Sequence, residues 1–238
     1  MILTRKQDLI EWILPYLIVE AFILARLAYN YLVELENLKL WLIYTTAQVS
    51  FFTLLSIWFV LKNGDKLADI GFKSENILSD VAQGLSYGIV IFVICFLMSG
   101  LAFAIAYTFV NFIFQVIALG PSLRMYYPPK YILFLYSLAI SPFAEELYFR
   151  GYSLYKLEKS GIGKKTASFL QSLMFSLYYW RLGLIRGIIP AFIMALLLER
   201  VYIKRRSLTA NLTARIVNNI IELFLFIYLK GTLFPLYY

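Results

Sequence analysis

Stretches of apolar residues long enough to cross a lipid bilayer recur along the whole chain. A membrane-spanning helix needs about 20 such residues. Of the 238 residues 61% are hydrophobic, and the mean hydropathy of +0.74 lies well outside the usage of soluble proteins. We therefore predict an all-α, polytopic transmembrane helix bundle with about seven spans. The expected spans are residues 12–33, 40–61, 81–120, 131–152, 166–180, 188–198 and 207–229.

One of the expected spans is longer than a single crossing requires. Residues 81–120 are almost continuously apolar, and at about 1.5 Å rise per residue they exceed the ~30 Å of hydrocarbon that a helix must cross. We expect a long tilted or broken span here, with Gly100 as the candidate kink or break point. The segment before it, 62–80, is the most polar of the chain and predicts a loop with a short interfacial element.

No stretch indicates a second, soluble domain. We expect one membrane domain over residues 1–238, with N-terminal spans in 1–130 and a core that carries the polar motifs in 131–229.

The positive charges of the chain act as topology signals. The net charge is +8, but the Lys and Arg residues cluster between apolar stretches instead of forming one basic face, which argues against a nucleic-acid partner. More of them fall in cytoplasmic segments when the N-terminus is inside and the C-terminus outside, as the positive-inside rule requires. We expect a multi-pass protein of a cell membrane, oriented N-in and C-out, with membrane lipids around it.

Two adjacent carboxylates, Glu145 and Glu146, lie near the end of one apolar stretch. Ionisable side chains inside a span are costly, which makes both residues candidates for a functional site. On a helix Glu146 can pair with Arg150 four residues later, whereas Glu145 is rotated by about 100° and can face another partner. One glutamate can thus be structural and the other chemical.

Further polar and aromatic residues recur at helical spacing in the later spans. Phe175 and Tyr179 are four residues apart, and so are Arg215 and Asn219 in the last span. A guanidinium about eight residues inside a span needs a carboxylate. The candidates for that partner are Glu145, Glu146 and Glu222.

The order and spacing of these residues resemble the three motifs of the CPBP family, which comprises the type 2 CAAX prenyl endopeptidases and the bacteriocin-processing, or Abi, intramembrane proteases. The resemblance covers about residues 141–220. It implies a helix bundle with a cavity open to the cytosol and the bilayer, in which the first glutamate activates a water for peptide hydrolysis. The matching motifs are Glu145-Glu146-x-x-x-Arg150, Phe175-x-x-x-Tyr179 and Arg215-x-x-x-Asn219.

Carried over residue by residue, the resemblance makes Glu145 the general base and Glu146 and Arg150 its supporting pair. Asn219 matches the last motif directly. Tyr179 and Arg215, however, occupy the positions at which the family usually has histidine, and the sequence contains no histidine at all. A tyrosine cannot take a proton at neutral pH, because its ordinary pKa is about 10.

The sequence offers little for metal binding. The single cysteine, Cys95, excludes an intramolecular disulfide, and without histidine the usual zinc ligands are missing. The oxygens of Glu145, Glu146, Asn219 and Glu222 would suit magnesium or calcium better, but Arg215 argues against a cation there. We predict no catalytic zinc and no cofactor.

Three functions stay open on this basis. The first is an endopeptidase that acts on membrane-tethered or prenylated peptides, with Arg215 and Asn219 as oxyanion donors. The second is an inactive pseudoprotease that acts as a scaffold, regulator or immunity factor by holding a membrane-protein partner or peptide, with Arg215 paired to Glu145 or Glu146. The third is a transporter or channel, which is disfavoured because the charges cluster in the second half of the chain without an inverted repeat.

Overall fold

The computed structural model describes residues 2–33, 38–73, 76–109, 132, 136 and 140–228. All regular elements within these residues are helical, which confirms the all-α prediction. The chain divides into two compact units, neither of which is a continuous stretch of sequence. Unit 1 consists of Met1–Glu75, Arg124–Ala167 and Arg206–Leu208, and unit 2 of Asn76–Leu123, Ser168–Arg205 and Thr209–Tyr238.

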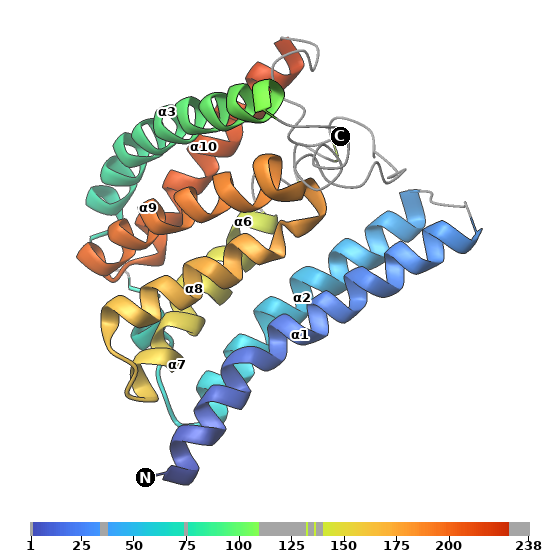
Figure 1. Ribbon diagram of the computed structural model, residues 1–238. Helices are drawn as coiled ribbons and strands as arrows, with labels where there is room; N and C mark the ends of the chain where they lie inside the picture. The colour runs from blue at the N-terminus through green and yellow to red at the C-terminus, as the bar shows by residue number, and fades with distance from the viewer. Residues whose placement is uncertain are drawn as a thin grey trace. The chain divides into compact units, whose positions relative to one another are not determined.

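Unit 1 is built around two long helices. They are α1 (Ile2–Val33) and α2 (Leu38–Lys62), which run side by side (Figure 1). The 3-10 turn η1 (Leu67–Ile70) lies in the polar segment, where a short interfacial element was predicted. α1 starts well before the expected span and contains Pro15 in its interior.

The helix with the two glutamates completes unit 1. It consists of α6 (Ser141–Glu145), the π-helical stretch η3 (Glu146–Ser153) and α7 (Leu154–Lys159). α2 contacts α6 and η3, and α1 contacts η3 and α7. Aromatic stacking holds the contact with α2, since the ring centroids of Phe52 and Tyr148 are 4.6 Å apart. Most of residues 131–139, the first half of the expected span, lie outside the described residues.

Unit 2 contains the other long helices. They are α3 (Ile77–Phe109), α8 (Lys164–Tyr178), α9 (Ile189–Arg205) and α10 (Leu208–Tyr228). The first residues of α8 and of α10 belong to unit 1. The short turns η4 (Trp180–Leu182) and η5 (Leu184–Ile188) connect α8 with α9.

The helix does not break at Gly100, one of the two possibilities that we predicted there. α3 continues through Gly100 as one α-helix, because a glycine inside a helix costs only about 1 kcal/mol relative to alanine and does not remove a backbone hydrogen bond. The long apolar stretch is therefore one long helix as far as Phe109, and residues 110–120 lie outside the described residues.

Two glycines on α3 allow α10 to approach closely. A Cβ atom at Gly84 would lie 2.6 Å from the Ala210 carbonyl oxygen, and one at Gly88 would lie 2.8 Å from the Ala214 carbonyl oxygen. Such a Gly-x-x-x-Gly spacing is a common device for close packing of helices in membranes. The two glycines thus allow the backbone of α10 to lie directly against α3.

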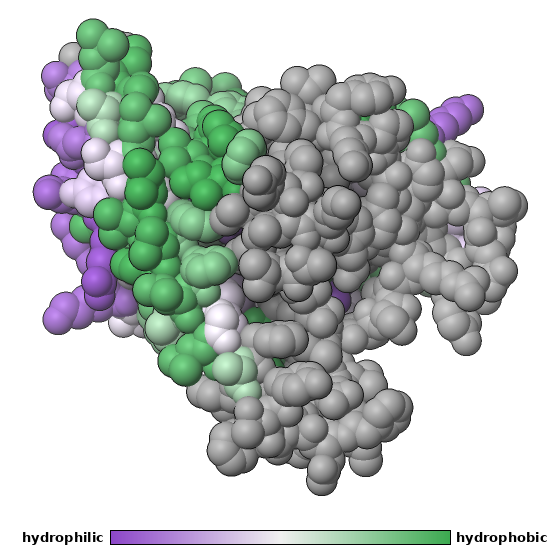
Figure 2. Space-filling model, turned by 90° about the horizontal axis from the view of Figure 1, so that it is seen from above, coloured by the Kyte–Doolittle hydropathy of each residue, from purple (hydrophilic) through white to green (hydrophobic). Residues whose placement is uncertain are grey.

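Two helical stretches of the described chain are long and apolar enough to cross a membrane. They are Leu38–Lys62 and Ile77–Leu101. Many large apolar side chains of α3 are exposed, Leu78, Leu85, Leu97 and Leu101 among them. Figure 2 shows a broad hydrophobic band next to a hydrophilic edge. The number of spans and the N-in, C-out orientation stay predictions.

Candidate functional site

The predicted pair of Glu146 and Arg150 forms inside η3. Arg150 Nη1 lies 3.0 Å from Glu146 Oε1, and the two side chains are 0% and 1% exposed. In a π-helical stretch each N–H bonds the carbonyl five residues back, and such stretches occur frequently at functional sites. The buried arginine neutralises the second glutamate and ties the two turns of η3 together.

Glu145 has a different partner. It is the last residue of α6 and is 4% exposed. The Ser141 hydroxyl donates a hydrogen bond to its Oε1 over 2.5 Å. The sequence analysis missed Ser141, although its position four residues before Glu145 places it on the same helical face. Glu146 is thus bound to a cation of its own helix, and Glu145 accepts a hydrogen bond from a hydroxyl of its own helix.

The two residues that we predicted at the family's histidine positions, Tyr179 and Arg215, contact one another. Arg215 Nη2 donates to the Tyr179 hydroxyl oxygen over 2.7 Å. The Arg215 guanidinium carbon also lies 5.5 Å from the centroid of the Phe175 ring, a cation–π contact. A third helix takes part, because Arg215 Nη1 contacts the Met194 sulfur. The Arg215 guanidinium on α10 is thus contacted by Phe175 of α8, by Tyr179 just after α8 and by Met194 of α9.

A glycine fixes the backbone of Tyr179. A Cβ atom at Gly187 would lie 2.2 Å from the Tyr179 carbonyl oxygen, which leaves space for hydrogen alone. Gly187 belongs to η5, so the turn before α9 packs directly on the end of α8. This contact holds the Tyr179 hydroxyl in reach of Arg215.

Asn219 lies one turn after Arg215 on α10, as the motif requires. Its neighbour Asn218 donates from Nδ2 to Glu222 Oε1 over 2.7 Å. Glu222 was one of the three predicted partners of Arg215, and here its side chain accepts from an asparagine of its own helix.

Comparison with known families identifies the segment that holds these residues. Residues 127–221 match the family described as type II CAAX prenyl endopeptidase Rce1-like. This segment is an Rce1-like domain. The match confirms the resemblance to CAAX-type proteases over this part of the chain, which is less than half of its length. No curated protein and no solved structure matched the chain.

The Rce1-like domain contributes to both units. Glu145, Glu146 and Arg150 lie in unit 1, whereas Tyr179, Arg215 and Asn219 lie in unit 2. The structure places the first three on one helix and brings Tyr179 and Arg215 together. The pairing of Arg215 with Glu145 or Glu146 stays a prediction.

Within the described residues, no three His, Cys, Asp or Glu side chains lie close enough together to hold a metal ion. The absence of a catalytic zinc stays a prediction.

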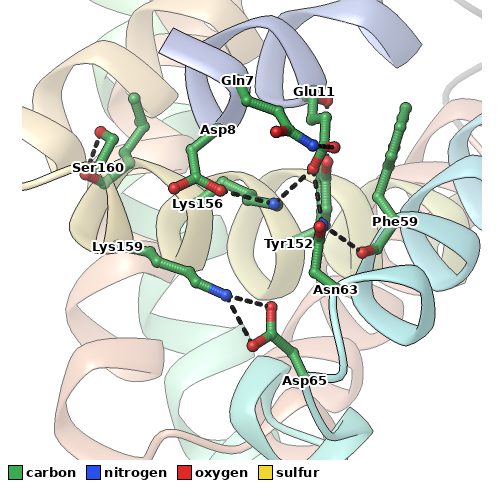
Figure 3. Close-up of polar contacts among 11 residues, drawn as sticks. Gln7, Asp8, Glu11, Phe59, Asn63, Asp65, Tyr152, Lys156, Lys159 and Ser160 are labelled. Carbon is green, nitrogen blue, oxygen red and sulfur yellow. Dashed lines mark hydrogen bonds and ion pairs between the residues drawn. The ribbon is translucent and has the colours of Figure 1, made fainter. Parts of the chain in front are cut away.

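A second polar cluster, which the sequence analysis did not find, lies where α1 meets η3 and α7 of the Rce1-like domain (Figure 3). Lys156 is completely buried, and its Nζ lies 2.8 Å from Asp8 Oδ1 and 2.6 Å from Glu11 Oε2. Glu11 also accepts hydrogen bonds from Gln7 and Asn63. The spacing of Asp8 and Glu11, one turn apart on α1, is the sequence signal that could have indicated this cluster.

Proposed function

We propose that this Rce1-like protein is an intramembrane endopeptidase that hydrolyses membrane-tethered peptides, prenylated ones included, with Glu145 as the general base. The observation that supports this role is the difference between the two glutamates. Arg150 is bound to Glu146, while Glu145 accepts a hydrogen bond from a neutral hydroxyl. Glu146 is thereby assigned to the structure of the helix and Glu145 to chemistry.

In the proposed reaction Glu145 takes a proton from a water molecule, and the water oxygen attacks the carbonyl carbon of the scissile peptide bond. The negative charge that forms on the carbonyl oxygen needs fixed donors. Arg215 and Asn219 are the proposed donors, one turn apart on α10. Collapse of the intermediate breaks the C–N bond, and Glu145 returns its proton to the leaving amine.

The Tyr179 hydroxyl has an orienting role in this proposal. It accepts a hydrogen bond from Arg215, which fixes the guanidinium. Because a tyrosine is not a base at neutral pH, no proton transfer is assigned to Tyr179.

The test is a cleavage assay of the whole protein in lipid vesicles, against prenylated and unprenylated membrane-tethered peptides. Glu145→Gln should lower turnover by about 10²- to 10⁴-fold, the usual contribution of a positioned general base. Glu158→Gln is the matched control, because Glu158 makes a half-exposed ion pair with Arg206 and its loss should leave turnover unchanged. Equal turnover in wild type and Glu145→Gln would refute the assignment.

The second candidate is a pseudoprotease that holds a membrane-protein partner or peptide without cleaving it. The observation that favours it is the absence of histidine from the whole chain, with an Arg–Tyr pair at the family's histidine positions. Under this function no peptide is cleaved by the wild type, while the Tyr179→His, Arg215→His double variant gains turnover because neutral imidazole can accept a proton. Turnover by the wild type that depends on Glu145 would exclude it.

A further inference from the structure

The helix that carries the two glutamates is hydrogen-bonded to the backbone of α1 along one face. The Tyr152 hydroxyl donates to the Glu11 carbonyl oxygen over 2.8 Å, and the Tyr148 hydroxyl donates to the Trp12 carbonyl oxygen over 2.8 Å. Lys156 binds the Glu11 carboxylate one turn further along. The three side chains, spaced by four residues, form a row that faces one turn of α1.

Pro15 explains why the Glu11 carbonyl is available to that row. In an α-helix the carbonyl of residue 11 accepts from the N–H of residue 15, and proline has no N–H. Pro15 lies well inside α1, so this hydrogen bond is missing within an otherwise continuous helix. A buried carbonyl without a donor is costly, and proline is tolerated inside a helix where a neighbouring element supplies that donor.

Tyr152 supplies that donor. Its side chain is completely buried, and its hydroxyl reaches the carbonyl that Pro15 leaves open. Figure 3 shows Tyr152 beneath Glu11, with Lys156 held between Asp8 and Glu11. The Glu11 carbonyl thus gives the helix formed by α6, η3 and α7, here called the glutamate helix, a fixed contact with α1. The contact is made by Tyr152, the seventh residue after Glu145.

We infer that Pro15 and Tyr152 are positioning residues for Glu145, and that α1, which lies outside the family-matched segment, sets the rotation of the glutamate helix. The hydrogen bond fixes the point at which η3 meets α1. Because α6 and η3 are continuous, this contact also sets the orientation of Glu145 at the end of α6. This inference deepens the proposed function and rests on Glu145 as its working group.

The test is a double-mutant cycle of Pro15→Ala and Tyr152→Phe in the full-length protein in lipid. Alanine restores the N–H of residue 15, so the Glu11 carbonyl no longer needs the tyrosine hydroxyl. Tyr152→Phe alone should lower the folding equilibrium constant about fivefold, which corresponds to one buried hydrogen bond. In the Pro15→Ala background the same change should have little effect.

A second cycle is the matched control. The Trp12 carbonyl, which binds Tyr148, would pair within α1 with residue 16, which is a tyrosine and keeps its N–H. The effect of Tyr148→Phe should therefore be the same with Pro15 and with alanine at that position. If Tyr152→Phe alone does not fold, recovery of folded protein by adding Pro15→Ala gives the same answer.

Positioning is measured separately from stability, by the rate at which a hydrophobic carbodiimide modifies Glu145 in the folded protein, followed by mass spectrometry. Tyr152→Phe should change this rate, and adding Pro15→Ala should restore the wild-type rate. Additive effects in the first cycle, or a labelling rate that does not change with Tyr152, would overturn the inference. The readout requires no hydrolysis, so a protein that cleaves nothing yet shows both effects would refute the endopeptidase and leave the positioning role standing.

Discussion

The Arg215 guanidinium and the Tyr179 hydroxyl, which we predict to occupy two histidine positions of the CPBP motifs, are joined by a hydrogen bond of 2.7 Å. The two residues therefore form one unit of structure, in which an aromatic hydroxyl accepts from a permanently charged donor. The pair has no base at neutral pH, but it holds a positive charge in a fixed place within its unit. In the proposed endopeptidase this charge stabilises an oxyanion, whereas in the pseudoprotease it pairs with a glutamate.

The Tyr179–Arg215 hydrogen bond should contribute measurably to stability. We expect Tyr179→Phe to lower the free energy of unfolding by about 1.5–3 kcal/mol, the range for a hydrogen bond to a charged group. Denaturant unfolding in detergent micelles measures the change. Tyr87→Phe is the control, because Tyr87 accepts from Lys204 at an exposed site over 3.2 Å; an equal loss in both variants would contradict the prediction.

Removing one member of the buried Glu146–Arg150 pair should be far more harmful than removing both. Arg150→Met leaves the Glu146 carboxylate buried next to an apolar side chain, and we expect a loss of about 3–5 kcal/mol. The Glu146→Gln, Arg150→Met double variant should recover part of that loss, because no charge is then buried. The same unfolding measurement tests this, and a double variant less stable than Arg150→Met would count against it.

The close contact of α3 and α10 should make two glycines respond in opposite ways. A Cβ at Gly88 would lie 2.7 Å from the Val217 Cβ, whereas a Cβ at Gly100 has no neighbour within 4 Å. We expect Gly88→Ala to destabilise by about 1–3 kcal/mol through overpacking. Gly100→Ala should stabilise by about 0.5–1 kcal/mol through helix propensity. Thermal unfolding of the two variants gives both signs.

Glu11 lies just before the first expected span and should make stability depend on pH. Burial alone would raise the pKa of Glu11, but hydrogen bonds from Lys156, Gln7 and Asn63 outweigh burial and hold it below its usual value. Its contribution to folding is therefore complete above the unfolded pKa of about 4.3 and is lost as the pH falls through the lower folded pKa. The free energy of unfolding, measured between about pH 3 and pH 7, should fall with decreasing pH in the wild type. It should fall less in Glu11→Gln, which has no carboxyl group at this position to titrate.

The elements of the fold could be predicted from sequence because each depends on local pattern. The apolar stretch of α2 and the turn η1 in the polar segment were found within a few residues. Gly100 was given too much weight, since a single glycine weakens a helix without ending it. The start of α1 was missed because its first turns are polar, and tertiary contacts of Asp8 and Glu11 with Lys156 stabilise them.

The candidate site could be predicted in part for a similar reason. The Glu146–Arg150 pair follows from i,i+4 spacing within one helix. The Tyr179–Arg215 hydrogen bond joins residues 36 positions apart, and no periodicity within a single helix predicts such a contact. The same holds for Tyr152 and the Glu11 carbonyl, where the decisive group is a backbone atom that sequence patterns do not describe.

The π-helical stretch Glu146–Ser153 constrains how the chain can change in length. A π turn contains about one residue more than an α turn, so a one-residue deletion there would leave a regular α-helix with its backbone bonds intact. Because the wider turn already absorbs the extra residue, the segments before and after it would keep their relative rotation. Tyr152 and Lys156 would then still face α1. A homologue shortened by one residue between the glutamates and α7 should therefore dock this helix through the same side chains.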